Sequence, residues 1–142
     1  MRSLVHTLRR AYVPTSVYNK TAAPIVFLDL QGRNVAGKVK VKLFNAQVPE
    51  AAENFKKMCE GFTDKKGKKV SFKGVKFTNH MKRFFMETEP VDQTVFGEPY
   101  LNESYETRFD RPGLIGLSSD VNNGKEESTS GFFVTLNDLP NL

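Results

Sequence analysis

The chain has 142 residues, of which 39% are hydrophobic and 11% aromatic, so it is large enough for one domain with a packed core. Its single cysteine, Cys59, excludes an internal disulfide framework and favours a reducing compartment. No run of about 18 apolar residues occurs, so no transmembrane segment is expected. Residues 1–20 carry four basic groups and no acid, and the remainder has 17 basic against 16 acidic groups, a net charge near +1. A body this close to neutral argues against phosphate-backbone binding, and we expect no direct nucleic acid partner.

Residues 1–20 form a basic N-terminal segment that we separate from a domain over residues 21–142. Its apolar residues Leu4, Val5 and Leu8 follow helical spacing, and its basic residues are Arg2, Arg9, Arg10 and Lys20. An Arg-rich, acid-free, amphipathic start is typical of a mitochondrial transit peptide, and a solvated basic tail is the alternative. The composition therefore predicts a mitochondrial protein, either in the matrix or in a complex associated with the inner membrane.

The sequence of residues 24–43 predicts a hairpin. Residues 24–30 are a short apolar run, which indicates a buried strand, and Gln31–Asn34 supply a turn. Residues 38–43 alternate strictly between lysines and apolar side chains, so Val39, Val41 and Leu43 are expected on the core face of a second strand.

A helix is predicted over residues 48–61. Pro49 suits the first helical position and Gly61 a C-terminal cap. Ala51, Phe55, Met58 and Phe62 fall on one face, which we expect to be buried. A lysine-rich connection, residues 63–73, follows the helix; we expect a solvated loop, with a basic patch for an acidic partner as the alternative.

Five blocks of the sequence occur in the order that a known family has. Phe77 and Phe84 have the spacing of the pattern F-H-R-I-x-x-x-F-x-x-Q-x-G-D, and the other blocks are residues 48–55, 96–98, 112–118 and 130–135. From residue 24 to its end, the chain resembles the cyclophilins, the prolyl-isomerase family. The resemblance implies a mainly β fold, a cyclophilin-like antiparallel β-barrel with an α-helical cap. The family pattern continues past Leu142, so we expect a barrel incomplete at its C-terminus, whose exposed strand edges, first of all near residues 131–136, offer a place for a partner chain.

The resemblance also implies which residues would form the site. Asn79 stands where the family has the arginine on which catalysis depends, and Glu87 and Gly131 stand where it has glutamines that orient the peptide. A short neutral amide cannot act as a long cationic donor, so no catalytic residue is expected. Arg83 would lie about 13 Å from Asn79 along a regular strand, too far to act in its place. What remains is a vestigial proline pocket, and the alternative is that its phenylalanines are only core; its members are Phe77, Phe84, Phe85, Glu87, Ser118, Gly131, Phe133 and Leu142.

No metal or cofactor is expected, because two histidines and one cysteine do not make a common zinc set. We predict a catalytically inactive structural subunit of a mitochondrial multiprotein complex, of respiratory or ATP-synthase type, with other protein subunits as partners and a position peripheral to a membrane. The alternatives are an active mitochondrial prolyl isomerase that assists protein folding, a proline-peptide binding module, and a component of the mitochondrial ribosome.

Overall fold

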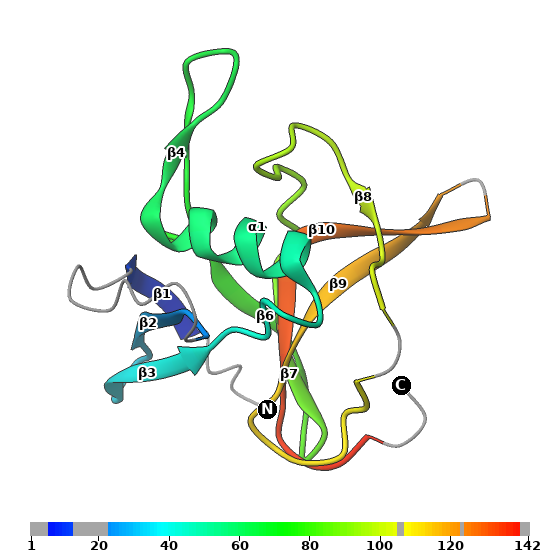
Figure 1. Ribbon diagram of the computed structural model, residues 1–142. Helices are drawn as coiled ribbons and strands as arrows, with labels where there is room; N and C mark the ends of the chain where they lie inside the picture. Colours follow the sequence, from blue (N-terminus) through cyan, green and yellow to red (C-terminus); the bar gives the residue numbers. More distant parts are fainter. Residues whose placement is uncertain (1–5, 13–22, 105–106, 123, 140–142) are drawn as a thin grey trace. The chain divides into compact units, whose positions relative to one another are not determined.

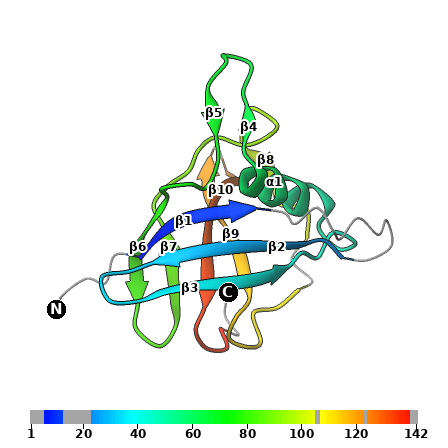
Figure 2. The same ribbon diagram turned by 90° about the vertical axis from the view of Figure 1, so that its left-hand side faces the viewer.

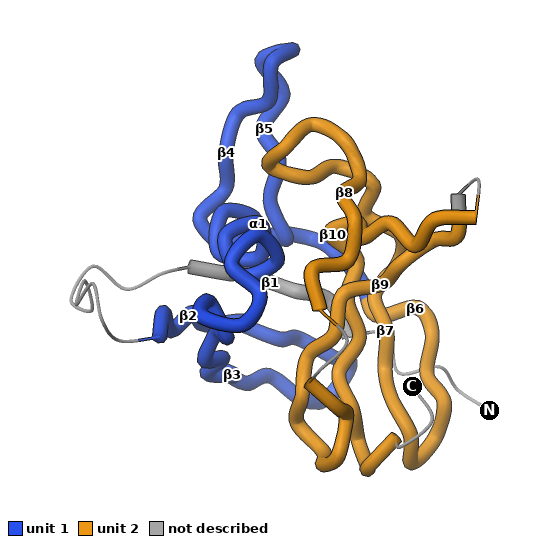
Figure 3. The backbone as a smooth tube through the Cα atoms, turned by 45° about the vertical axis from the view of Figure 1, so that its right-hand side comes forward, with its two compact units in different colours: residues 1–76 blue, residues 77–142 orange. Residues whose placement is uncertain are grey.

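The computed structural model describes residues 6–12, 23–104, 107–122 and 124–139 (Figure 1 and, turned by 90°, Figure 2). The chain divides into two compact units, residues 1–76 and 77–142 (Figure 3). Within the described ranges, no helix is long and apolar enough to cross a membrane.

The first unit contains an antiparallel sheet in the order β1-β2-β3 (Figure 2). Its strands are β1 (His6–Tyr12), β2 (Ile25–Gln31) and β3 (Ala36–Lys42). The predicted hairpin of β2 and β3 is confirmed, and Gly32 donates its amide hydrogen to the Val35 carbonyl in the turn, at 2.6 Å. Val26 and Leu28 of the central strand β2 are fully buried, as expected of an apolar run.

Two expectations about this sheet are wrong. The apolar spacing of the N-terminal segment is helical, but residues 6–12 form the strand β1. Their backbone groups pair with β2, and the local sequence pattern gives no information about this pairing. The apolar face expected for β3 is covered unevenly: the Val39 side chain is 42% exposed and Val41 is half-buried. Only Leu43, just beyond the strand, is buried, and its amide bonds to the Pro24 carbonyl at 2.8 Å.

Helix α1 (Pro49–Glu60) begins at its proline and ends at Gly61, as predicted. Gly61 has φ +79°, a conformation that glycine adopts readily, and its amide donates to the Lys57 carbonyl at 2.8 Å. Phe55 and Met58 are buried, and the Phe55 ring lies 5.0 Å from that of Phe72. The helix packs on β1 and β2 and completes the core of the first unit.

The lysine-rich connection is a hairpin and not an unstructured loop. Strands β4 (Phe62–Thr63) and β5 (Lys69–Val70) pair antiparallel, and Figure 1 shows the hairpin extending away from α1. The Asp64 carboxylate accepts the amide hydrogens of Lys66 and Lys68 at 2.9 and 2.8 Å, so a side chain closes the turn.

The second unit is a sheet in the order β6-β7-β10-β8, with β9 on the other edge of β10. Its strands are β6 (Lys76–Met81), β7 (Phe85–Thr88), β8 (Tyr100–Leu101), β9 (Ile115–Asn122) and β10 (Lys125–Thr135). Phe132 is fully buried and meets Phe77 edge to face, with ring centroids 5.7 Å apart. Phe133 and Val134 pair with β7 on one side and β9 on the other, so the open edge expected at this segment of the sheet is occupied by the chain itself.

Candidate functional site

The signature segment folds back on itself. The strand that starts at Lys76 ends at Met81, and the chain turns through Arg83, which has φ +69°, into β7. Asn79 thereby becomes the cross-strand partner of Glu87, with two further residue pairs between it and the turn. The separation of Arg83 from Asn79 was estimated for a regular strand; the chain turns instead, and Arg83 lies in the turn at the far end of this hairpin.

A carboxylate occupies the centre of the candidate site. Asn79 Nδ2 donates to Glu87 Oε2 at 3.1 Å, and Ser118 Oγ donates to Glu87 Oε1 at 2.7 Å. Both oxygens of the Glu87 side chain are thus engaged, one from β6 and one from β9. The sequence placed these three residues in one site but gave no sign that they bond to one another.

Gly131 leaves room for this contact between strands that are not neighbours. It lies on β10 near Thr88 at the end of β7 and Ser118 on β9, and a Cβ at this position would be 3.5 Å from Ser118 Oγ and 3.6 Å from Thr88 Oγ1. These are ordinary contact distances, and the glycine has no positive φ. Ser118 thus reaches Glu87 across β10 beside Gly131, at a place where a methyl group would also fit.

The phenylalanines of the predicted pocket lie in three different environments. Phe85 and Phe133 form an aromatic cluster with ring centroids 6.0 Å apart, and Phe109 joins it at 5.1 Å from Phe133. Phe77 is 5% exposed and belongs to the core with Phe132, as the core-only alternative held. Phe84, beside the turn, is 47% exposed.

The sequence-based prediction of this site named Leu142 and did not name Phe109. Leu142 lies outside the described residues. Phe109 was not predicted, because it comes from the irregular segment before β9, where no spacing rule connects it to β10.

Comparison with known proteins identifies the family. The model of the cyclophilin type peptidyl-prolyl cis-trans isomerase/CLD family matches residues 27–142. The chain belongs to the cyclophilin family. Among solved structures it is similar to the mimivirus cyclophilin, with a TM-score of 0.72 and 25% identity over 90% of this chain and 68% of that one. It is also similar to a Cryptosporidium parvum cyclophilin-type isomerase, with a TM-score of 0.59 and 25% identity over 75% of this chain and 65% of that one.

A second structure of the Cryptosporidium protein, determined in the presence of the dipeptide Ala-Pro, matches with a TM-score of 0.56 at 22% identity and shows the same fold. The chain spans about two thirds of the length of these cyclophilins. The predicted fold class, mainly β and cyclophilin-like, is confirmed.

Compared with the cyclophilin pattern, the site has the opposite electrostatic character. A neutral amide on β6 and a carboxylate on β7 stand where the pattern has a guanidinium and an amide. A carboxylate accepts hydrogen bonds and attracts cations, whereas a developing negative charge or lone pair on a substrate needs a donor. One of the two Asn79 amide hydrogens points to Glu87, and the group carries no charge with which to stabilise the substrate.

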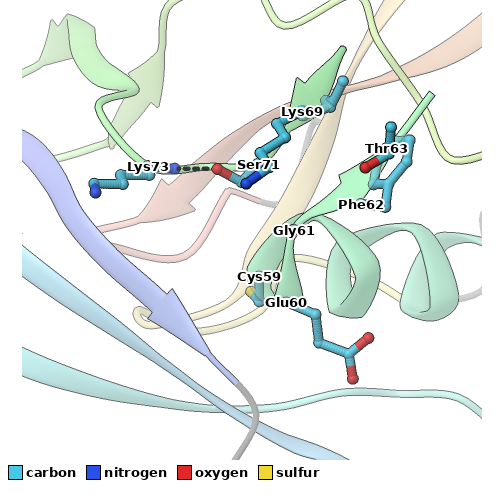
Figure 4. Close-up of a pocket in the computed structure, with 9 residues that line it drawn as sticks. Cys59, Glu60, Gly61, Phe62, Thr63, Lys69, Ser71 and Lys73 are labelled. Atoms are coloured by element: carbon cyan, nitrogen blue, oxygen red, sulfur yellow. Dashed lines mark hydrogen bonds between the residues drawn. The ribbon is translucent and has the colours of Figure 1, made fainter. Parts of the chain in front are cut away.

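A cavity lies away from this site, in the first unit (Figure 4). It has a volume of about 390 Å³ and lies between the end of α1 and the base of the β4–β5 hairpin. Lys69, Ser71 and Lys73 line it, with Cys59 at the helix end. Burial, and to a smaller extent the charge of Glu60, raise the pKa of the Cys59 thiol far above its usual range, so this sulfur is a packed thiol and not a nucleophile.

Proposed function

We propose that this cyclophilin-family chain does not catalyse prolyl isomerisation and serves as a structural subunit of a mitochondrial multiprotein complex, of respiratory or ATP-synthase type. The observation that carries the proposal is the Asn79–Glu87–Ser118 network, which puts a neutral amide where the family has a cationic donor and binds that amide to a carboxylate. Rotation about a prolyl bond has a barrier near ~20 kcal/mol, and an enzyme lowers it by electrostatic stabilisation of the twisted amide. A bonded carboxamide beside a carboxylate offers no such stabilisation.

The structural role is supported by the first unit and by the N-terminal composition. Strand β3 ends its sheet, and Val39 within it and Val35 just before it are exposed, at 42% and 61%. A terminal strand with apolar side chains is a surface onto which a partner strand can add. The Arg-rich, acid-free residues 1–20 support delivery to mitochondria.

Catalytic inactivity is tested with a proline-containing tetrapeptide. We expect the purified chain to leave the isomerisation rate at the uncatalysed background, and Phe84→Ala to change nothing, because the site lacks a positioned cationic donor. Turnover clearly above background that Phe84→Ala abolishes would support the alternative of an active isomerase. Titration of the same peptide tests the remaining alternative: saturable binding at millimolar concentration would favour a proline-peptide module built on the Phe85, Phe109 and Phe133 cluster.

Membership of a complex is tested by size. Native mitochondrial extract separated by size exclusion is expected to contain the chain in fractions far larger than its own 16.0 kDa. A fusion of residues 1–20 to a fluorescent protein, compared with a fusion in which Arg2, Arg9 and Arg10 are changed to Gln, checks the localisation separately. Migration only as a monomer would contradict the structural role even if the chain is mitochondrial.

A further inference from the structure

The two units carry opposite charge. Within residues 21–142, the part that belongs to the first unit, residues 21–76, contains 12 Lys and Arg against 5 Asp and Glu, a net charge of +7, whereas residues 77–142 contain 5 against 11, a net charge of −6. The near-neutral average of the body therefore conceals a strongly basic unit. The expectation of no nucleic acid partner rested on that average. The first unit alone has the large excess of basic over acidic residues that is typical of nucleic-acid-binding domains.

The β4–β5 hairpin concentrates this charge in a short, fixed structure. Five lysines and one acid lie within residues 61–74, and the lysines are Lys65, Lys66, Lys68, Lys69 and Lys73. The turn is held by the Asp64 carboxylate, by the Gly67 amide donating to the Asp64 carbonyl at 3.0 Å, and by the positive φ of Gly67, +80°. The acid in the hairpin thus fixes the turn, and the lysines are displayed around it. We call the five lysines and this turn the lysine hairpin.

These five ammonium groups have no ion pair within the described part of the chain. Glu60, at the base of the hairpin, pairs instead with Lys56 and Lys57 of α1, at 4.0 and 3.4 Å. Figure 4 shows its carboxylate directed away from Lys69 and Lys73. Like charges held together without acids repel, so an external anion would relieve a repulsion that the fold leaves in place.

The side chains indicate which polyanion fits. Every residue from Asp64 to Lys69 is polar or glycine, so the tip has no apolar side chain to insert into a bilayer. Lysine is depleted in protein–protein interfaces, and the hairpin has no arginine or exposed aromatic ring to serve as an anchor. A two-stranded ribbon enters the major groove of a nucleic acid duplex, with lysines before and after its turn available to phosphates on both sides of the groove.

We propose that the lysine hairpin binds the phosphate backbone of a nucleic acid without sequence preference. Lysine acts as a point charge on phosphate, and Asp64, the residue at the tip able to accept from a base, is occupied by backbone amides. The hydroxyls of Thr63 and Ser71 lie with Lys69 and Lys73 along the cavity at the hairpin base, where they add donors for a phosphate. This binding is independent of the structural role and compatible with it.

The test uses the full chain and fluorescently labelled duplexes, DNA and RNA, of about 20 base pairs in random sequence, with anisotropy measured at about 50 and about 200 mM salt. The hairpin variant removes four charges: Lys65→Gln, Lys66→Gln, Lys68→Gln and Lys69→Gln. The matched control removes four exposed charges from the second unit: Lys82→Gln, Arg83→Gln, Arg108→Gln and Arg111→Gln. All eight side chains are exposed, and circular dichroism with a thermal melt checks that both variants fold.

We expect the hairpin variant to bind at least roughly 30-fold more weakly than the natural chain at low salt, and its slope of log affinity against log salt to become shallower by about 3. The control is expected to stay within about threefold of the natural chain, and duplexes of different sequence to bind alike. Equal loss in both variants would reduce the effect to net charge and overturn the proposal. So would hairpin-dependent binding to phosphatidylserine vesicles with none to either duplex, which would make the partner a membrane.

Discussion

The triple variant Asn79→Arg, Glu87→Gln, Gly131→Gln is expected to accelerate isomerisation of a proline tetrapeptide roughly 100-fold over the uncatalysed background, at which the natural chain leaves the rate. The change restores the three polar groups of the family pattern. The arginine guanidinium is a long and permanently charged donor. An uncharged glutamine at position 87 binds this guanidinium less strongly than the Glu87 carboxylate would, so the guanidinium stays available to a substrate. Position 131 accepts a Cβ, which would meet its neighbours at ordinary distances of 3.5 and 3.6 Å.

The single variant Asn79→Arg is the informative control. Residues 79 and 87 are cross-strand partners, so the new guanidinium would lie against the Glu87 carboxylate and bond to it in place of a substrate. We expect it to yield less than about a tenth of the gain, and the neutral Asn79→Gln to yield none. If the triple variant folds and stays inactive, the missing guanidinium is not the cause of inactivity; if Asn79→Gln alone suffices, a neutral amide can do the work.

The local signals in the sequence predicted the elements that depend only on local chemistry. Pro49 and Gly61 mark the ends of α1 correctly, because proline lacks the amide hydrogen that a first helical residue leaves unbonded and glycine adopts positive φ without strain. The apolar run before Gln31 identified β2, and the order of the family blocks identified the fold. The hairpin turn also had a signal that went unused, since Asp64 and Gly67 stand at the first and fourth positions of a turn.

The candidate site was predicted as a set of residues but not as a set of bonds. The turn at Arg83 has no glycine, proline or asparagine to announce it, so the pairing of Asn79 with Glu87 stayed hidden. In β3, alternation places Val39 on a given face of the strand but says nothing about what covers that face. Both failures have one cause, because pairing and coverage depend on residues far away in sequence.

Close packing next to the site predicts a large effect for one methyl group, Gly116→Ala. A Cβ at Gly116 of β9 would come within 2.7 Å of Phe109 Cζ and Phe133 Cε1, closer than real side chains approach. The Phe133 ring is fixed by Phe85 on one side and Phe109 on another, so it has little freedom to move. We therefore expect a loss of about 2–3 kcal/mol in the free energy of unfolding, measured by urea denaturation.

The matched control for this variant is Gly131→Ala, which adds the same methyl group to the neighbouring strand β10. Its Cβ would have nothing nearer than Ser118 Cβ and Oγ at 3.5 Å, so we expect a change within about 0.5 kcal/mol. The contrast separates crowding from the general effect of alanine on an extended glycine, since both residues lie in strands of the second unit and neither has a positive φ. If Gly116→Ala loses as little as Gly131→Ala is expected to lose, the aromatic cluster yields to the added methyl, and Phe109 and Phe133 are not held in a fixed arrangement beside the Glu87 network.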